Sequence, residues 1–443
     1  MAQKLFRDPL YDYIIIDLNK YDWLLDLINC PELQRLRYIS QLGLGQFTYP
    51  GSTHSRFSHS LGVMHLMKEC LAHLRQDYSN YIKPLDEDAL LAAALLHDVG
   101  HSPFSHATEA VFGDHEKRAL KIIQNPDSDI NKVLRKRAKT LPDKVSGLFA
   151  ERTDAPLWQK SLISSQLDLD RLDYLRRDSL YSGAEYGNFD CFRIVHTMQL
   201  QEKTIEGKQK EIFAVWPNKS KFAIEEYLFS RFYMYQSVYF HHTTKAYEGL
   251  LDKILIRAQD IARDNKGFAR KLLSPVRIMM GGIEAEDPGN FQMLTDNAVL
   301  AQITLWQNSK DRILQDLSQR LLLRKGIGWT EILTGTPFEM ADRIEKVREY
   351  LFKKGLDHKY YFMEHNPEKA PYQPYSSSSA GEEQTSVNSI MLYDPNWPGT
   401  HFREITEAPG LDRLKAITGA PPATLRYYFP KEHQQEITRL LKG

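Results

Sequence analysis

The stretch that decides the fold is Ala89-Leu90-Leu91-Ala92-Ala93-Ala94-Leu95-Leu96-His97-Asp98-Val99-Gly100-His101. An apolar run without a polar face is typical of a helix that is buried on all sides. An imidazole and a carboxylate at the end of such a helix need partners, because an unpaired buried charge is costly. The run therefore predicts a buried helix that ends at a polar site. Taken alone, His97-Asp98 is equally compatible with a pair that merely caps the helix C-terminus.

Two other segments supply partners of the same chemical kind. Upstream, His59 lies in the sequence HSRFSHSLGV, and eight of the fifteen histidines fall between His54 and His115. Downstream, carboxylates alternate with apolar residues in SSQLDLDRLDYLRRD, which spans residues 164–178. Two imidazoles and two carboxylates from three helices would make a mixed nitrogen and oxygen site. That donor set suits Mn²⁺, Mg²⁺ or Fe, with Co²⁺, Ni²⁺ and Zn²⁺ as alternatives, and disfavours a thiolate-type structural metal.

Three ordered motifs carry a resemblance to a known family. They are Arg56-Phe57-Ser58-His59-Ser60-Leu61-Gly62-Val63, then Leu96-His97-Asp98-Val99-Gly100-His101-Ser102-Pro103-Phe104-Ser105-His106, then Asp168-Leu169-Asp170-Arg171-Leu172-Asp173-Tyr174. Together they resemble the HD superfamily of metal-dependent phosphohydrolases, and more narrowly its deoxynucleoside triphosphate triphosphohydrolases. The likeness extends from about Phe6 to His242 with little gapping.

The resemblance implies four metal ligands: His59, His97, Asp98 and Asp170. Asp168 competes with Asp170 for the fourth position, and Asp170 is preferred because the family motif matches there. A divalent ion at such a site polarises a phosphoryl oxygen and lowers the pKa of a bound water.

The resemblance also implies catalytic residues in the segment that follows the dipeptide: His101, His106, Glu109 and His115. His106 and Glu109 are three residues apart, so on a helix they would share one face. In the family reading the carboxylate orients the imidazole, which handles the proton of the leaving oxygen. The alternative is that these two residues form an exposed polar pair.

A triphosphate needs nearby cations, and a deoxyribose needs an apolar wall. By resemblance, cations and aromatic residues supply both, and the expected substrate-binding residues are Gln41, Leu42, Arg56, Arg171, Tyr174, Asp178, Arg231 and Tyr239. In the family, the position of Tyr239 packs on C2′ and leaves no room for a ribose 2′-hydroxyl, and that of Asp178 accepts the 3′-hydroxyl. For Arg231 and Tyr239 the alternatives are a surface arginine and a core tyrosine.

A second ligand site is expected in Pro31-Glu32-Leu33-Gln34-Arg35-Leu36-Arg37. In activated members of the family this segment binds a guanine nucleotide between subunits of a tetramer. Gln34 and Arg37 match that pattern, which implies a dGTP or GTP activator and a homotetramer or homodimer. An ordinary amphipathic helix with solvated polar residues is the alternative.

Composition limits the class of protein. The chain has 443 residues, 42% of them hydrophobic and 26% charged, as in folded soluble proteins. Lys+Arg and Asp+Glu both total 57, so no global basic field would hold nucleic acid, and nucleic acid is not indicated as a partner. Three scattered cysteines and the lack of a long apolar run favour a cytoplasmic protein without a membrane span.

The predicted fold is mainly α. It has an HD-type helical core, a short N-terminal strand pair within residues 1–18, and a smaller mixed α/β C-terminal region. We expect a catalytic domain over residues 1–270 and the mixed region over 271–443, with a mobile loop at 374–387. Ser102 followed by Pro103 predicts the start of a short helix, because serine is a good N-cap and proline suits the first helical turn.

The predicted activity is metal-dependent hydrolysis of dNTPs to deoxynucleoside and inorganic triphosphate. One alternative is an HD phosphohydrolase that acts on nucleoside monophosphates or a signalling nucleotide. Another, from a different class, is a nucleotide sensor or nucleic-acid-binding protein in which the metal is structural.

Overall fold

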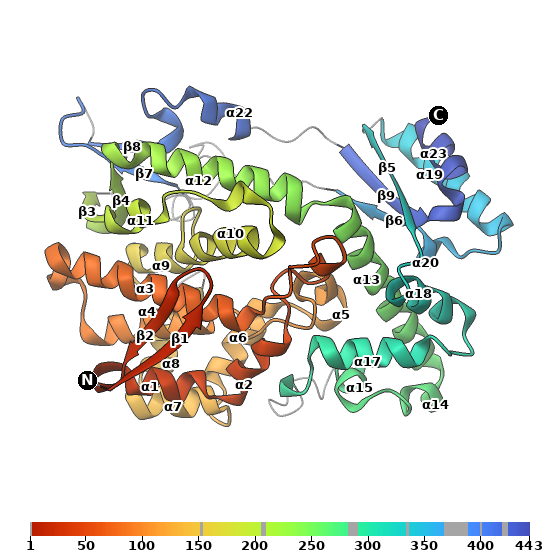
Figure 1. The fold of residues 1–443 in the computed structure, drawn as a ribbon, viewed down its shortest axis with the longest axis horizontal. Helices are drawn as coiled ribbons and strands as arrows, with labels where there is room; N and C mark the ends of the chain where they lie inside the picture. The colour runs from red at the N-terminus through yellow and green to blue at the C-terminus, as the bar shows by residue number, and fades with distance from the viewer. Residues whose placement is uncertain are drawn as a thin grey trace.

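The computed structural model describes residues 2–150, 154–204, 210–281, 291–333, 336–366, 389–398, 401–418 and 424–443. The fold is mainly α with a few small sheets, as predicted (Figure 1). Within the described residues, none of the helices has the length and apolar character needed to cross a bilayer. The loop expected at 374–387 lies outside the described residues, and the boundary at residue 270 stays a prediction.

The chain begins with the predicted strand pair. Strand β1 (Gln3–Asp8) pairs antiparallel with β2 (Asp12–Asp17), in a register that places Asp8 opposite Asp12. The Asp8 carboxylate closes the turn by accepting the backbone N–H of Leu10 at 2.9 Å. Its other oxygen accepts from Arg177 at 2.8 Å, which ties the hairpin to the helical body.

The helical body surrounds two long antiparallel-packed helices, α3 (Arg56–Tyr78) and α4 (Pro84–Leu96). Every residue from Ala89 to Leu96 is buried, as the apolar run predicts. The other elements of this body are α1 (Leu18–Ile28), α2 (Pro31–Gln34), η1 (Arg35–Tyr38), η2 (Gly45–Phe47), η3 (Ser79–Tyr81), η4 (Ser105–Thr108), α5 (Glu109–Phe112), α6 (His115–Gln124), α7 (Asp129–Arg137), α8 (Leu141–Phe149), α9 (Leu157–Ile163), α10 (Leu169–Ser182), η5 (Glu185–Gly187) and α11 (Cys191–His196).

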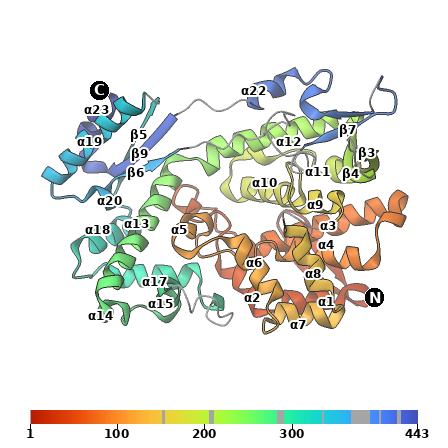
Figure 2. The ribbon, with the colours of Figure 1, turned by 180° about the vertical axis from the view of Figure 1, so that it is seen from behind.

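A broken long helix connects this body to the C-terminal region. It consists of α12 (Lys221–Met234), a π-helical turn η7 (Tyr235–Tyr239) and α13 (His242–Asp264). In Figures 1 and 2, α12 lies along α10 at the top of the view, whereas α13 leaves the direction of α12 and runs downward. The π-helical turn therefore lies where the chain leaves the helical body, and it carries Tyr239.

Two small sheets lie at opposite ends of the long axis (Figure 2). One has the order β3-β4-β7-β8, in which β4 pairs parallel with β7 although some 175 residues separate them. The other has the antiparallel order β5-β9-β6 and is covered by α19 (Pro337–Lys353) and α23 (Gln434–Lys442). Their strands are β3 (Gln199–Thr204), β4 (Lys210–Pro217), β5 (Ile327–Leu333), β6 (Met363–His365), β7 (Met391–Tyr393), β8 (Phe402–Glu404) and β9 (Thr424–Pro430).

The remaining helices complete the chain. η6 (Asn218–Ser220) directly precedes α12, and the others follow α13: α14 (Lys266–Ala269), α15 (Ser274–Gly281), α17 (Asp296–Trp306), α18 (Arg312–Leu322), α19 (Pro337–Lys353), α20 (His358–Tyr361), η9 (Ile405–Glu407), η10 (Asp412–Leu414), α22 (Lys415–Thr418), η11 (Lys431–His433) and α23 (Gln434–Lys442). The largest hydrophobic cluster runs from Ile14 to Ile417, and a second cluster lies wholly between Ile332 and Leu441.

The expected helix at Ser102-Pro103 is wrong in its start. Residues 103 and 104 form a turn, η4 begins at Ser105, and the α-helical turn α5 begins only at Glu109. The reason is the backbone: Phe104 (φ 57°) and Ser105 (φ 56°) both lie in the left-handed region, which a right-handed helix excludes. His106 consequently falls in η4, whereas Glu109 begins α5.

Candidate metal centre

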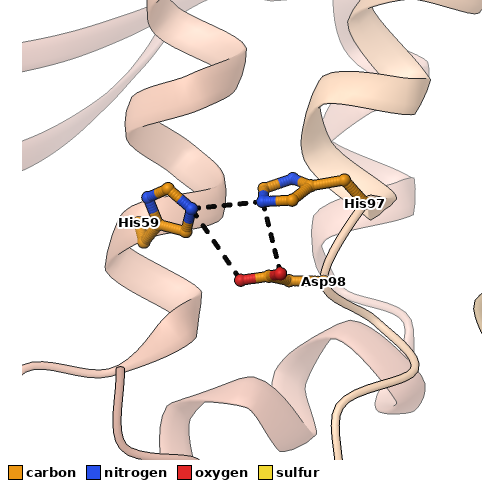
Figure 3. Close-up of side chains that lie close together, drawn as sticks. All are labelled: His59, His97 and Asp98. Carbon is orange, nitrogen blue, oxygen red and sulfur yellow. Dashed lines mark hydrogen bonds and ion pairs between the residues drawn. The ribbon is translucent and has the colours of Figure 1, made fainter. Parts of the chain in front are cut away.

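The four predicted metal ligands converge. The Nε2 atoms of His59 and His97 lie 3.1 Å apart, and Asp170 Oδ1 lies 2.9 Å from His59 Nε2 and 3.6 Å from His97 Nε2. Asp98 Oδ1 lies 3.4 Å from His97 Nε2, and Figure 3 shows both imidazoles and this carboxylate facing one another. The ligands come from α3, the end of α4 and the first turn of α10.

The arrangement fits one divalent ion. Two nitrogens bound at about 2.1 Å to a common ion lie roughly 3.0–3.4 Å apart, and the two Nε2 atoms match that separation. The His97 Nδ1–H donates to the carbonyl of Ala94 at 2.9 Å, and the His59 Nδ1–H faces Asp173 Oδ1 at 2.7 Å. Each Nδ1 is thus held by an acceptor, which leaves each Nε2 facing the centre, where the donor atom of a metal-ligating histidine would lie.

A layer of buried charges supports the ligands. Asp173 accepts from Arg177 Nε at 2.8 Å and from the Tyr11 hydroxyl at 2.9 Å, in addition to its contact with His59. Burial raises the pKa of Asp173, but the charge of Arg177 and the hydrogen bonds from His59 and Arg177 lower it further, so that the carboxylate stays ionised. Sequence reasoning missed Asp173, Arg177 and Tyr11. The spacing of Asp173 and Arg177 by four residues on a helix was the one available signal.

Arg56 lies on the opposite side of the ligands. Its Nη1 donates to Asp98 Oδ2 at 2.6 Å, and its Nε donates to the Ser105 hydroxyl at 2.7 Å. Burial raises the pKa of Asp98, yet Arg56 and the nearby histidines hold it well below its usual value. Burial and the Arg56 charge lower the pKa of His101 well below its usual value, so His101 stays neutral.

Two of the three predicted catalytic histidines form a second group beside the first. The rings of His101 and His115 stack with centroids 3.9 Å apart, and His115 Nδ1 contacts the Glu109 carboxylate. His101, Glu109 and His115 are close enough to share a cation. The expected pairing of Glu109 with His106 stays a prediction, because the side chain of His106 lies outside the described residues.

The predicted sugar-binding residues also meet. Tyr239 donates to Asp178 Oδ2 at 2.8 Å, and the Tyr174 and Tyr239 rings lie 6.0 Å apart, edge to face. The other Asp178 oxygen contacts His54 Nε2 at 2.7 Å. The rings of His54 and Tyr181 stack with centroids 4.4 Å apart. Sequence reasoning missed both residues, because neither has a spacing to other site residues that would mark it.

The structure also places the remaining predicted substrate-binding residues, which are Arg171, Arg231, Gln41 and Leu42. Arg171 is held by Asp168, which caps α10 by accepting the Arg171 N–H at 2.8 Å. Asp168 is therefore a capping residue, consistent with the preference for Asp170 as ligand. Arg231 donates to the side chain of Gln166 at 2.7 Å, the Gln41 N–H donates to the His54 carbonyl at 3.0 Å, and Leu42 packs on the core.

The two predicted effector residues contact each other. Arg37 Nε donates to Gln34 Oε1 at 2.7 Å, and the Arg37 guanidinium stacks on the Phe57 ring at 3.7 Å. Gln34 lines an open hollow together with Arg35, Tyr38, Gln292, Thr295 and Asn297. Their role in binding an activator stays a prediction.

We expect Gly62→Ala to disturb the residues that support the predicted ligands. Gly62 lies on α3 against α10, and a Cβ there would overlap the Asp173 carboxylate and the Arg177 guanidinium. We expect a loss of about 2–4 kcal/mol in unfolding free energy from overpacking and a disturbed buried ion pair, and weaker divalent-ion binding. Chemical denaturation and Mn²⁺ titration would measure both. Gly183→Ala is the matched control for the Cβ, since no atom lies within 4 Å of one there, although its positive φ of 74° adds backbone strain. Parental stability and ion affinity in Gly62→Ala would contradict this account.

Comparison with known proteins agrees with the geometry. The family model described as the HD domain matches residues 56–178. An uncharacterised protein of Bacillus subtilis, YwfO, is 34% identical over 97% of this chain and 93% of its own length. A crystal structure of a phosphohydrolase from Bacteroides thetaiotaomicron aligns with TM-score 0.75 at 27% identity, covering 97% of this chain and 100% of that one.

A third relative has a named activity. The mouse deoxynucleoside triphosphate triphosphohydrolase SAMHD1 is 30% identical over 47% of this chain and 36% of its own length. The matched segment, the ligand geometry and the full-length relatives agree with one another. The chain belongs to the HD-domain superfamily of phosphohydrolases and is related to its deoxynucleoside triphosphate triphosphohydrolases.

Proposed function

We propose that this hydrolase converts dNTPs to deoxynucleoside and inorganic triphosphate. The observation that carries the proposal is the contiguity of two sites: the predicted four-ligand centre at His59 lies against Tyr174, Tyr174 lies against Tyr239, and Tyr239 donates to Asp178. The ring centroids of His59 and Tyr174 are 6.4 Å apart. A nucleotide whose sugar rests on the tyrosines would therefore present its α-phosphate near the imidazoles.

His59, His97, Asp98 and Asp170 would hold the divalent ion, which when bound supplies Lewis acidity and a water of lowered pKa. Arg56, Arg171 and Arg231 are permanent cations, and they would offset the charge of the triphosphate. His115 Nδ1 is oriented by Glu109, which leaves its Nε2 to contact phosphate or exchange a proton there. His106 remains the expected donor to the leaving 5′-oxygen.

The wall of the sugar site supports deoxynucleotides as substrates. Asp178 is buried, and its two oxygens are held by His54 and Tyr239, so it can accept a 3′-hydroxyl only at a fixed position. A ring at Tyr239 that packs on C2′ would leave a 2′-hydroxyl without space or partner. The relatives named SAMHD1 act on dNTPs, which supports the same substrate class. Manganese or magnesium as the ion, a dGTP or GTP activator, and a homo-oligomer form part of the proposal.

Product analysis tests the reaction. We expect the purified chain with Mn²⁺, supplied with the four dNTPs in the presence and absence of GTP, to release tripolyphosphate and deoxynucleoside in equal amounts. Ion chromatography with nucleoside detection would measure both. Release of orthophosphate or pyrophosphate instead would reject the triphosphohydrolase step and favour another HD phosphohydrolase reaction.

Asp170→Ala separates an enzyme from a protein with a structural metal. The Asp170 side chain is about one-third exposed and contributes a ligand rather than a core contact, so we expect the variant to fold, to bind Mn²⁺ at least 10-fold more weakly and to lose turnover. Circular dichroism, Mn²⁺ titration and product assays would follow the three properties. Asp264→Ala, at the exposed end of α13, is the control. Unfolding of Asp170→Ala, in a parent without activity, would support the structural metal.

Tyr239→Ala tests the sugar wall. Removal of the ring opens space at C2′, so we expect the ratio of dATP to ATP hydrolysis to fall at least 10-fold. Tyr239→Phe retains the ring and loses only the hydroxyl that donates to Asp178, so it should retain most of the discrimination. Tyr233→Ala, an exposed tyrosine on α12, is the control for loss of an aromatic residue. An unchanged ratio in Tyr239→Ala would show that another residue excludes the 2′-hydroxyl.

A further inference from the structure

The turn between the ligand Asp98 and η4 has a conformation that its own sequence does not favour. Phe104 and Ser105 are consecutive non-glycine residues with positive φ, each of which costs free energy unless the surroundings impose it. Both side chains are buried. Something outside the turn must therefore hold its backbone in place.

The holding group is a carboxylate from a distant part of the chain. Asp296, the first residue of α17, is buried and accepts the Phe104 N–H through Oδ1 at 2.8 Å. Its Oδ2 accepts the Ser40 N–H, also at 2.8 Å. Two N–H groups that are 64 residues apart in sequence thus share one carboxylate. Each N–H would otherwise lack that buried acceptor, which is costly to lose.

The segment that contains Asp296 makes a second connection to this turn, through Arg35. Arg35 is buried, and its Nη1 donates to the Leu294 carbonyl at 2.8 Å while its Nη2 contacts the carbonyls of Val99 and His101. The Phe291 ring stacks under the Arg35 guanidinium at 3.9 Å. Residues 291–296 are therefore joined to the segment from Val99 to Phe104 directly by the Asp296 carboxylate and indirectly by the Arg35 guanidinium, which bridges the two segments.

A continuous path of hydrogen bonds leads from Asp296 to the metal ligands. The Ser105 hydroxyl donates to the Ser40 carbonyl at 3.2 Å and accepts from Arg56 Nε at 2.7 Å. Arg56 in turn donates to the ligand Asp98 at 2.6 Å. If Phe104 and Ser40 shift, the Ser105 hydroxyl moves with them. Arg56 then loses the hydrogen bond to Ser105 that orients its guanidinium towards Asp98.

We propose that Asp296 is a positioning residue of the active centre: by holding Phe104 and Ser40 it fixes Ser105 and Arg56, and through them the ligand Asp98. Nothing in the local sequence marks Asp296, because Leu294-Thr295-Asp296-Asn297 reads as an ordinary helix start with Thr295 as N-cap. Its effect on turnover rests on the proposed function, whereas its effect on ion binding does not.

The test measures Mn²⁺ affinity by electron paramagnetic resonance, and kcat on the best dNTP substrate, in folded protein. For Asp296→Ala we expect about 10-fold weaker Mn²⁺ binding and a 10- to 100-fold lower kcat, the range typical of groups that orient metal ligands. Asp296→Asn retains the shape and one acceptor oxygen, so it should fold and give an intermediate loss. Asp311→Ala is the matched control, because Asp311 caps α18 and pairs with Arg257 away from the turn. It should lower the melting temperature without changing Mn²⁺ affinity.

A double variant tests the path. If Asp296 acts through Ser105, Asp296→Ala combined with Ser105→Ala should be little worse than the more damaging single variant. Multiplied losses would overturn that route. Parental Mn²⁺ affinity and kcat in folded Asp296→Ala or Asp296→Asn would overturn the proposal itself. If the parent hydrolyses no dNTP, the proposed function fails, and the Mn²⁺ comparison still decides the role of Asp296.

Discussion

The buried contact between Asp173 and His59 is the constraint on which the candidate metal centre depends. An imidazole can ligate an ion only through a nitrogen that carries no proton, and the carboxylate of Asp173 holds the proton of His59 on Nδ1. The same carboxylate is held by Arg177 and by the Tyr11 hydroxyl. Arg177 also donates a hydrogen bond to Asp8 in the N-terminal hairpin. The orientation of one ligand is therefore fixed by elements from three separate parts of the chain.

A buried network of this kind stabilises one arrangement more than it stabilises the fold. Two carboxylates and a guanidinium pay a large desolvation cost, which their mutual attraction only offsets. What they provide is geometry: His59 cannot rotate without losing its buried acceptor on Asp173. Arg56 plays the corresponding part for Asp98 on the other side. The four predicted ligands are thus preorganised, which would lower the cost of binding an ion.

The helices, the hairpin and the convergence of the four predicted ligands could be predicted from the sequence, because their signals are local or motif-based. The all-apolar run from Ala89 to Leu96 predicts a buried helix, and the motif around Asp170 selects it over Asp168, which instead caps α10. The start of the helix after Ser102 was predicted wrongly. Local cap preferences favour a helix there, but the tertiary contact from Asp296 to Phe104 imposes another backbone. His54 and Asp296 could not be found, since their partners are fixed only by the fold.

The link between residue 296 and the segment around Asp98 has a consequence for biosynthesis. A chain emerging from the ribosome presents the hairpin, α3, α4 and α10 long before α17, and the elements that carry the ligands can pack as soon as Ser182 is out. The turn at Phe104 still waits for its carboxylate until more than a hundred further residues have been made. In that interval a nascent chain would hold its predicted ligands without the two hydrogen bonds to Asp296, so we expect the centre to reach its final geometry only after the C-terminal half has been made.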